Sequence, residues 1–463
     1  MALIASISGV RGTIGGSPGE NLTPPDIVRF AAAYGKFLQE EGVPKRIVIG
    51  RDARPSGPMV KALVMQTLIS MGFELIDLDL ATTPTVEIAV PREKAGGGII
   101  LTASHNPKEW NALKLLNRRG EFLSKSNGQR VLTLYQNQKL SFAPVEELGP
   151  SPLKKDYLEQ HIEEVLGLEL VDGPAIQKAD LKIAVDGVNS VGGLYVPALL
   201  RALGVKAITE RYCEPTGEFP HNPEPLAENL TEICTLVAEG DYDLGIVVDP
   251  DVDRLAFITE KGKMFGEEYT LVAVADYVLS QTPGAAVSNL SSSRALQDIC
   301  QRHEQDYFAS AVGEVNVVEK MKAEDAVIGG EGNGGIIYPA AHYGRDALVG
   351  IGLFLTHLVY SGKKMSELRA SYPDYFMCKA KVAVEQGQDV DGLLKRFANA
   401  QAEHIPNLTD GVKISFADRW VHLRKSNTEP IIRIYTEAPT QAEADALAAE
   451  YQEKLNSLQP QNA

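Results

Sequence analysis

The spacing of apolar positions predicts helices and strands that alternate along most of the chain. Thr23 and Pro24 suit the start of a helix, and apolar residues then recur every three or four positions as far as Leu38. Short apolar runs follow, in an order typical of a sheet covered by helices. The strands are expected at 46–50, 73–78 and 97–102, and a second helix at 58–70.

The same order of elements is repeated twice, first from Lys182 and again from a helix near Glu268. The stretch after about Pro373 differs, because it holds several β-type runs and two helices. The expected fold class is therefore α/β, with three similar mixed α/β domains followed by a C-terminal α+β domain. The predicted divisions are domain I at 1–150, domain II at 151–257, domain III at 258–370 and domain IV at 371–463.

Composition excludes several classes of protein. The 463 residues carry 45 Lys+Arg against 61 Asp+Glu, a formal charge of −16, which argues against a surface that covers a nucleic-acid backbone. The four cysteines lie far apart and predict neither a disulfide framework nor a cysteine metal site. No segment approaches the roughly 18 apolar residues of a membrane-spanning helix. We therefore expect a cytoplasmic protein with no membrane or nucleic-acid partner.

The segment TASHNP at 102–107 directly follows a predicted strand. Ligands bind at the carboxyl ends of parallel strands, so Ser104 is expected to face a binding site. A hydroxyl in that place suits a nucleophile or a carrier of a phosphoryl group. The alternative is a turn that only closes the strand.

The segment DPDVDR at 249–254 follows another buried strand. Asp249, Asp251 and Asp253 alternate, so their carboxylates point to one side and repel each other unless a cation is present. Hard oxygen ligands of this kind suit Mg²⁺, whereas a solvated acidic turn is the alternative. The phosphatase signature DxDx[TV] fits in neither frame, because its fifth position would be Asp253 or Leu255.

Two further loops carry polar groups. In GGEGNGG at 329–335, glycines allow close backbone approach, and Glu331 and Asn333 suit sugar hydroxyls, although a glycine-rich hairpin turn explains the segment equally well. In RKSNTEP at 424–430, the side chains match a phosphate dianion, and a polar turn is the alternative. The candidate phosphate ligands there are Arg424, Ser426, Asn427 and Thr428.

These four loops, in this order and at these spacings, resemble the α-D-phosphohexomutase family, which includes phosphoglucomutases, phosphomannomutases and phosphoglucosamine mutases. The resemblance extends from Arg11 in SGVRG, through GRDAR at 50–54, to the final domain. It implies four domains around a central active-site cleft, each contributing one loop. It also implies an enzyme that interconverts hexose 6-phosphate and 1-phosphate through a phosphoserine and a 1,6-bisphosphate intermediate.

The resemblance implies a role for each matching residue. Ser104 would carry the phosphoryl group and would hold one Mg²⁺ per chain together with Asp249, Asp251 and Asp253. Lys114 and Arg11 would stabilise the transition state, and His105 would act as a base or orient Ser104. The implied substrate ligands are Arg254, Glu331, Asn333, Arg424, Ser426, Asn427 and Thr428.

The choice of sugar rests on subgroup features. Many relatives carry Ser-Gly-His where this chain has Asn333-Gly334-Gly335, yet SHNPKEWNALKLLN and GGEGNGGIIYP resemble the phosphoglucosamine mutases. We therefore expect conversion of glucosamine 6-phosphate to glucosamine 1-phosphate. The alternatives are phosphomannomutase or phosphoglucomutase activity by the same mechanism and, in a different class, a non-catalytic phosphosugar-binding protein.

The remaining expectations concern the activator, the assembly and secondary positions. A glucose- or hexosamine-1,6-bisphosphate is expected as activator, and the chain is expected to be a monomer or a homodimer. Glu314 stands where relatives often place a substrate-facing residue, and its alternative is an exposed carboxylate in the first turn of a helix. His342 and Arg345 either face the cleft or simply lie in a loop.

Overall fold

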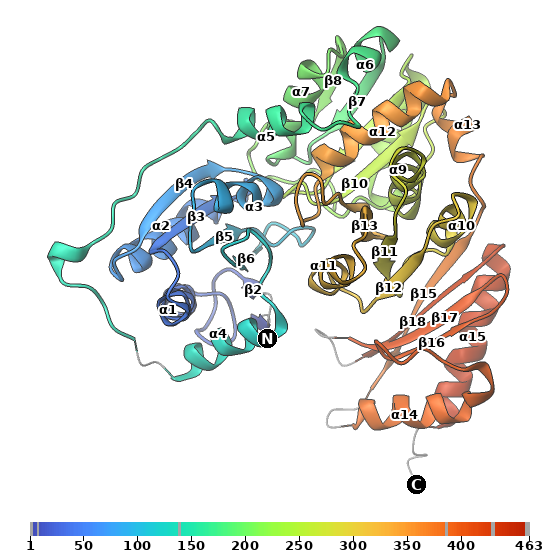
Figure 1. Ribbon diagram of the computed structural model, residues 1–463. Helices are drawn as coiled ribbons and strands as arrows, with labels where there is room; N and C mark the ends of the chain where they lie inside the picture. The colour runs from blue at the N-terminus through green and yellow to red at the C-terminus, as the bar shows by residue number, and fades with distance from the viewer. Residues whose placement is uncertain (1–2, 7–8, 138–139, 385–387, 427–430, 459–463) are drawn as a thin grey trace.

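The computed structural model describes residues 3–6, 9–137, 140–384, 388–426 and 431–458, which form four sheets with their helices (Figure 1). The sheets follow one another along the chain and lie in an arc, with domain I and domain IV at its two ends. This agrees with the expected three mixed α/β domains plus a C-terminal α+β domain.

Domain I has a six-stranded sheet in the order β1-β2-β6-β5-β3-β4, in which β4, β3 and β5 are parallel and the other pairings are antiparallel. Its strands are β1 (Leu3–Ser6), β2 (Gly9–Thr13), β3 (Arg46–Arg51), β4 (Glu74–Leu80), β5 (Gly97–Leu101) and β6 (Trp110–Leu116). Its helices are α1 (Pro24–Glu41), α2 (Gly57–Ile69), α3 (Thr83–Arg92) and α4 (Lys125–Asn137), and the 3₁₀ turn η1 (Val145–Glu147) follows.

Alternating side chains of the central strands explain why helices cover both faces of this sheet. Ile47 and Ile49 pack in the same apolar cluster as residues of α1 and α2, whereas Val48 packs with Val86 and Ala89 of α3 on the other face. Successive side chains of a strand point to opposite faces, so an uninterrupted apolar strand requires a helix on each side. Helix α3 therefore covers the face of the sheet opposite to α1 and α2, and this face meets the next domain.

Domains II and III have four-stranded sheets in the orders β10-β9-β7-β8 and β12-β11-β13-β14. Domain II comprises α5 (Tyr157–Leu166), α6 (Gly173–Ala179), β7 (Lys182–Asp186), α7 (Gly192–Ala202), β8 (Ala207–Arg211), η2 (Ala227–Asn229), α8 (Thr231–Glu239), β9 (Leu244–Val248) and β10 (Leu255–Thr259). Domain III comprises α9 (Glu267–Gln281), β11 (Ala286–Asn289), α10 (Ala295–Arg302), β12 (Tyr307–Ser310), α11 (Glu314–Ala323), β13 (Ile328–Glu331), β14 (Gly335–Ile337), α12 (Ala347–Ser361) and α13 (Met365–Arg369).

The three α/β sheets share one topology and place their loops equivalently. In each, the last parallel strand turns back into an antiparallel neighbour, from β5 to β6, from β9 to β10 and from β13 to β14. The segments that make these turns are 102–109, 249–254 and 332–334. The three polar loops singled out in the sequence therefore occupy the same position in three successive sheets.

Domains II and III share an apolar core. A single cluster includes Val185 of β7, Leu199 of α7, Val274 of α9 and Leu353 of α12. Helix α12 of domain III also contacts α5 and α6 of domain II, so it belongs structurally to both units. Strand β10 pairs with β9 as far as Thr259, so the predicted division after residue 257 falls inside this strand.

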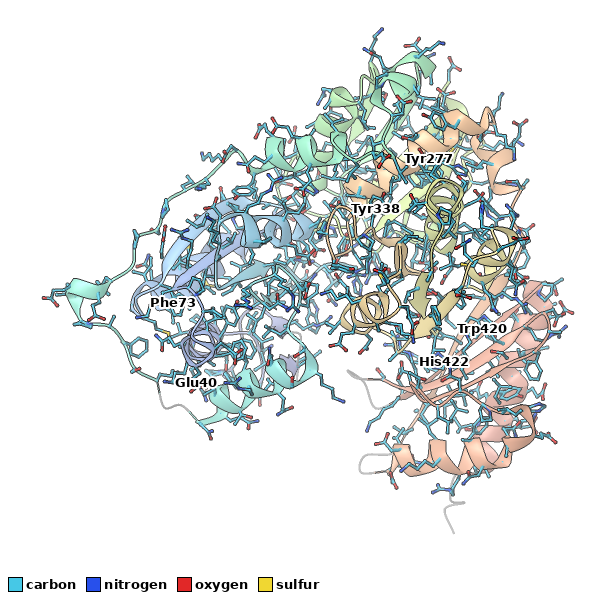
Figure 2. The ribbon with its side chains drawn as sticks, viewed as in Figure 1. Glu40, Phe73, Tyr277, Tyr338, Trp420 and His422 are labelled. Carbon is cyan, nitrogen blue, oxygen red and sulfur yellow. The ribbon has the colours of Figure 1, made fainter. Side chains whose placement is uncertain are left out.

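Domain IV has an antiparallel sheet in the order β15-β18-β17-β16. Its elements are β15 (Phe376–Ala383), α14 (Val390–Ala400), η3 (Ala402–His404), β16 (Val412–Ser415), β17 (Trp420–Lys425), β18 (Ile431–Ala438) and α15 (Gln441–Ser457). Leu423 and Ile434 on one face of the sheet pack with Phe397 of α14 and Tyr451 of α15. The other face carries His422 and is turned toward domain III (Figure 2).

Two chain-wide expectations concern cysteines and membranes. All four cysteines are free thiols. Within the described ranges, none of the helices combines the length and the apolar character that crossing a membrane would demand.

Candidate active site

Ser104 lies just beyond the end of β5, in the loop that turns back to β6. Its backbone takes a left-handed conformation with φ 50°, and its amide donates to Thr102 Oγ1 at 2.9 Å. Its Oγ donates to Asp249 Oδ2 at 2.8 Å, across the boundary between domains I and II. A positive φ at a residue other than glycine is a strained conformation that surrounding contacts must maintain. The loop is therefore built to present this hydroxyl to the second loop.

Arg54 supplies those surrounding contacts. Its side chain is completely buried, and its Nε pairs with Asp52 Oδ2 at 2.9 Å. The rest of the guanidinium donates to carbonyl oxygens of the serine loop, so one rigid fork fixes the loop's backbone. The carbonyls that accept are those of Ser104, Asn106 (2.7 Å), Pro107 (2.5 Å) and Trp110 (3.0 Å). The motif GRDAR was noticed in the sequence, but this role of Arg54 was not predicted.

The aspartates of the second loop converge as predicted. One carboxylate oxygen each from Asp249, Asp251 and Asp253 lies within 4.8 Å of the others, and all three side chains are buried. Asp249 Oδ1 accepts the amides of Asp253 and Arg254 at 3.2 and 3.1 Å, which curls the loop around this carboxylate. Val252 takes a φ of 64° within the same turn. The loop is buried and tightly turned, so the alternative of a solvated acidic turn is wrong.

The three carboxylates have distinct electrostatic surroundings. Burial raises the pKa of Asp249 well above its usual value, and the charges of Asp253 and Asp251 add to the rise. Burial also raises the pKa of Asp251, but the Lys114 ammonium outweighs it, so the net shift is downward. Lys114 Nζ donates to Asp251 Oδ2 at 2.7 Å, and Thr83 Oγ1 donates to the same oxygen at 2.6 Å.

The triad is suited to hold a divalent cation. Asp251 Oδ1 and Asp253 Oδ1 are buried and have no hydrogen-bond partner, whereas the other oxygen of each carboxylate is already bonded to a cationic side chain. An unpartnered buried carboxylate oxygen is costly, and a hard cation satisfies several at once. The oxygens left open are therefore those that a Mg²⁺ ion beside Ser104 would use.

Arg345 joins the second loop to the third and was given no defined role from the sequence. Its Nη2 donates to Asp253 Oδ2 at 2.7 Å and its Nε to Glu314 Oε2 at 2.9 Å. Its Nη1 lies 3.2 Å from Glu331 Oε2 and 3.4 Å from Asn333 Oδ1. Although burial alone would lower it, these carboxylates hold the pKa of Arg345 well above its ordinary value. Glu314 is buried in this ion pair, so the alternative of an exposed carboxylate is wrong.

The third loop packs directly on the start of β10. Gly334 has φ 82°, and a Cβ at this position would fall 2.1 Å from the carbonyl oxygen of Leu255. Only glycine permits this approach, in which the Leu255 amide donates to the Gly334 carbonyl at 3.1 Å. The same packing places Glu331 and Asn333 beside Arg345, and thus close to the aspartate loop. Glycine at position 334 therefore allows the third loop to pack beside the aspartate loop.

A group of basic side chains surrounds the serine loop. Arg254 pairs with Glu224 Oε1 at 3.1 Å, and burial together with the charge of Arg254 lowers the pKa of Arg11 on β2. Burial lowers the pKa of His105 to about 2, with Arg254, Arg11 and Lys114 adding to the effect. His105 is therefore neutral at ordinary pH, and its Nδ1 lies 3.4 Å from Ser104 Oγ. Such a group of cations suits a phosphate.

The fourth loop joins β17 to β18 in domain IV. Arg424 lies opposite Arg433 on the neighbouring strand, its guanidinium is 5.9 Å from the Tyr435 ring centroid, and its buried Nε has no hydrogen-bond partner. Ser426 is buried at the end of β17. The other two predicted phosphate ligands, Asn427 and Thr428, lie outside the described residues.

Comparison with known proteins places the whole architecture in one family. The four domain models of "Phosphoglucomutase/phosphomannomutase" match in order: alpha/beta/alpha domain I at residues 4–141, domain II at 155–262, domain III at 266–375 and the C-terminal domain at 380–454. The chain therefore belongs to the phosphoglucomutase/phosphomannomutase family of the α-D-phosphohexomutases.

Relatives and solved structures agree with this assignment. A phosphoglucomutase/phosphomannomutase of Thermococcus kodakarensis is 36% identical over 94% of this chain and 95% of its own. A phosphoglucosamine/phosphogalactosamine mutase of Sulfurisphaera tokodaii is 30% identical over 97% of this chain and 98% of its own. A crystal structure of a phosphoglucomutase/phosphomannomutase family protein from Burkholderia thailandensis shares the fold, with TM-score 0.84 at 22% identity over 99% of this chain and 98% of that one. Membership of this family places the chain among the isomerases that act by phosphoryl transfer.

Proposed function

We propose that this protein interconverts a hexose 6-phosphate and its 1-phosphate through a phosphorylated Ser104. One observation carries the proposal: the Ser104 hydroxyl is held 2.8 Å from Asp249 beside two further buried carboxylates that each keep one open oxygen. A hydroxyl at the edge of a cation site, surrounded by arginine and lysine, suits a group that accepts and returns a phosphoryl group.

In the transfer step, a sugar hydroxyl attacks the phosphorus on Ser104. A bond forms between the sugar oxygen and phosphorus, and the bond between phosphorus and Ser104 Oγ breaks. His105 Nδ1 lies 3.4 Å from Ser104 Oγ, so its ring is placed to pass the proton that the sugar hydroxyl loses to the departing Ser104 Oγ. Arg11 and Lys114 would face the negative charge that spreads over the transferring oxygens.

The aspartates would hold the metal ion of this site. With Mg²⁺ bound by Asp249, Asp251 and Asp253, the ion would offset charge on the phosphoryl oxygens. Lys114 and Thr83 stay on Asp251 Oδ2, and Arg345 stays on Asp253 Oδ2, so these side chains orient the carboxylates toward the serine.

A mutase must also hold its intermediate while the two phosphates exchange places. Arg424 and Ser426, with Asn427 and Thr428, would bind whichever phosphate is not reacting, while Glu331 and Asn333 would bind sugar hydroxyls. Because these ligands belong to different domains, movement of domain IV would let a 1,6-bisphosphate turn without leaving.

Glucosamine phosphate is the proposed sugar. Glu314 and Glu331 share the single guanidinium of Arg345, because Asp253 also lies 3.5 Å from Lys114 and belongs to the metal triad, which leaves an excess of negative charge beside the third loop. Such surroundings favour an ammonium group over a neutral hydroxyl at the second carbon of the sugar. A turnover assay with glucosamine, glucose and mannose phosphates, each primed with a trace of 1,6-bisphosphate, tests this choice. A clear preference for mannose phosphate would contradict it and leave the phosphoserine proposal intact.

Intact mass spectrometry tests the phosphoserine itself. We expect a phosphorylated fraction that maps to Ser104 and disappears when sugar phosphate is added. A protein that binds sugar phosphate yet never carries phosphate on Ser104 would instead be a non-catalytic binder.

A further inference from the structure

A chain of buried hydrogen bonds connects domains I, II and III behind the aspartate loop. Thr85 of α3 shares a hydrogen bond of 2.9 Å with Nδ1 of His161 on α5, and Nε2 of His161 lies 2.8 Å from Asp346 Oδ2. Nε2 of His342 lies 3.1 Å from the same carboxylate oxygen. Asp346 accepts only, so each histidine presents an N–H to it. The other ring nitrogen of His342, Nδ1, therefore points away from Asp346.

That nitrogen faces Glu87, two residues beyond Thr85 on α3. His342 Nδ1 lies 3.5 Å from Glu87 Oε2, which is too far for a good hydrogen bond. Both carboxylate oxygens of Glu87 and the His342 Nδ1 are buried without a hydrogen-bond partner, and Glu87 is 2% exposed. Three buried polar atoms thus meet at one point without a hydrogen bond, which is unfavourable and which a cation between them would relieve.

We propose that Glu87 and His342 form a second cation site, which binds a divalent transition-metal ion of the Zn²⁺, Mn²⁺ or Co²⁺ type between domains I and III. Two ligand atoms about 2.1 Å from one ion are about 3.5 Å apart at a near-tetrahedral angle, which is the separation found here. The Asp346 carboxylate behind His342 is the usual support of a metal-bound imidazole, because it fixes the tautomer.

Water completes the coordination. Glu87 and His342 line a cavity of about 330 Å³ between the domains, whose wall also includes Arg119, Glu121 and Tyr343. Among the described residues, three metal-ligating side chains converge at Asp249, Asp251 and Asp253 and at no other place. The second site therefore has two protein ligands. Arg119 and Glu121 pair with each other at 2.8 Å, whereas the Glu87 carboxylate and His342 Nδ1 on this wall have no hydrogen-bond partner.

The surrounding charge also favours a cation. Lys114 and Arg345 are already bonded to Asp251, Asp253 and Glu314, and no lysine or arginine among the described residues pairs with the Glu87 carboxylate. Burial, Glu314 and Asp253 raise the pKa of Glu87. A metal competes with protons for a carboxylate and an imidazole, so its binding is expected to weaken as the pH falls. This inference does not depend on the proposed mutase activity.

Titration of the metal-stripped full chain with Co²⁺, followed by calorimetry and visible absorption, tests the proposal. We expect two ions per chain in the unmodified protein and one in each of Asp251→Asn, Glu87→Gln and His342→Gln. The double variant Asp251→Asn/Glu87→Gln should bind none. Glu121→Gln is the matched control, because it lies on the same cavity wall but is paired with Arg119 and Lys322, and it should still bind two.

Thermal unfolding supplies an independent measurement. In the Asp251→Asn background, Co²⁺ at ten times its Kd should raise the Tm by about 2 °C, and this rise should vanish when Glu87→Gln is added. A single ion in the unmodified protein would overturn the proposal. Glu87 and His342 would then share a proton and not a metal ion. Two ions retained in both Glu87→Gln and His342→Gln would overturn it as well.

Discussion

The loops of domains I, II and III differ from the loop of domain IV in how they are held. The first three contact one another through buried polar groups: Ser104 donates to Asp249, Lys114 pairs with Asp251, and Arg345 pairs with Asp253. Domain IV instead meets domain III through the face of its sheet that carries Trp420 and His422 (Figure 2).

The contacts between domains III and IV include an ion pair of Lys379 with Glu267 at 2.7 Å and several separate hydrogen bonds. His422 Nδ1 accepts from Ser291 Oγ at 2.9 Å, Lys413 Nζ donates to the Leu290 carbonyl at 2.6 Å, and the Arg294 amide donates to Glu437 at 2.9 Å. Groups that take part in bond making require fixed positions, whereas a domain that only holds the distal phosphate can move. Under the proposed function, the first three loops would form a rigid reacting centre, and domain IV would be a more weakly attached holder of the distal phosphate.

The largest effect is expected from Ser104→Ala, which removes the reacting hydroxyl from the rigid centre. Turnover should fall by a factor on the order of 10⁴, since no neighbouring group can carry the phosphoryl group. The fold should lose only about 1 kcal/mol, the value of one hydrogen bond. A coupled turnover assay and denaturant unfolding measure both quantities, and substantial residual turnover would show that the centre does not act through this serine.

Arg345→Met is expected to have the largest effect on stability. It leaves Asp253, Glu314 and Glu331 together without their shared cation, which should destabilise the protein by about 3–5 kcal/mol. Arg119→Met is the matched control, because Arg119 is largely exposed and Glu121 keeps its pair with Lys322, so the change should cost about 1 kcal/mol or less. Equal effects of the two variants in urea unfolding would remove the distinction between the rigid centre and the surface.

Acid should weaken the attachment of domain IV through His422. Burial lowers the pKa of His422 from 6.5 to about 4, so between these values the unfolded chain binds the proton that the folded protein excludes. Its contribution to stability is therefore fully present above pH 6.5 and is lost as the pH falls to about 4, a change of about 3 kcal/mol.

The variant His422→Gln keeps hydrogen-bonding capacity but does not titrate. Its free energy of unfolding should decline less between pH 6.5 and 4 than that of the unmodified protein. If the free energy of unfolding fell equally with pH in the two proteins, His422 would not make the stability of domain IV depend on pH.

The smallest effect is expected from Arg424→Ala in domain IV. Loss of one charged hydrogen bond to the distal phosphate, about 1.5 kcal/mol, should raise KM roughly tenfold and leave kcat within about twofold. Arg419→Ala, which removes an exposed arginine paired with Asp418 in the same domain, is the control and should change neither. A large fall in kcat for Arg424→Ala would place this residue in the reacting centre instead.

Local patterns in the sequence predicted much of the fold and the convergence of the metal loop. The aspartates alternate directly after a buried strand, which predicted their convergence, but a tight turn with Val252 at φ 64°, and not an extended backbone, brings their carboxylates together. The packing of α12 against domain II could not be predicted in this way, because an apolar helix does not specify which of two neighbours it covers. The residue that unites two loops, Arg345, lies 92 positions from Asp253, and no local pattern connects them.

The sequence by itself determined the order of the elements, the three repeated α/β units and the polar loops at their strand ends. Periodicity and glycine placement act over a few residues, and those residues are adjacent in the chain. Only the tertiary structure decided which charges meet: Arg54 on the serine loop, Arg345 on three carboxylates, and Glu87 opposite His342. Such contacts depend on how separate sheets pack, because a buried charge is compensated by whichever element the packing brings to it.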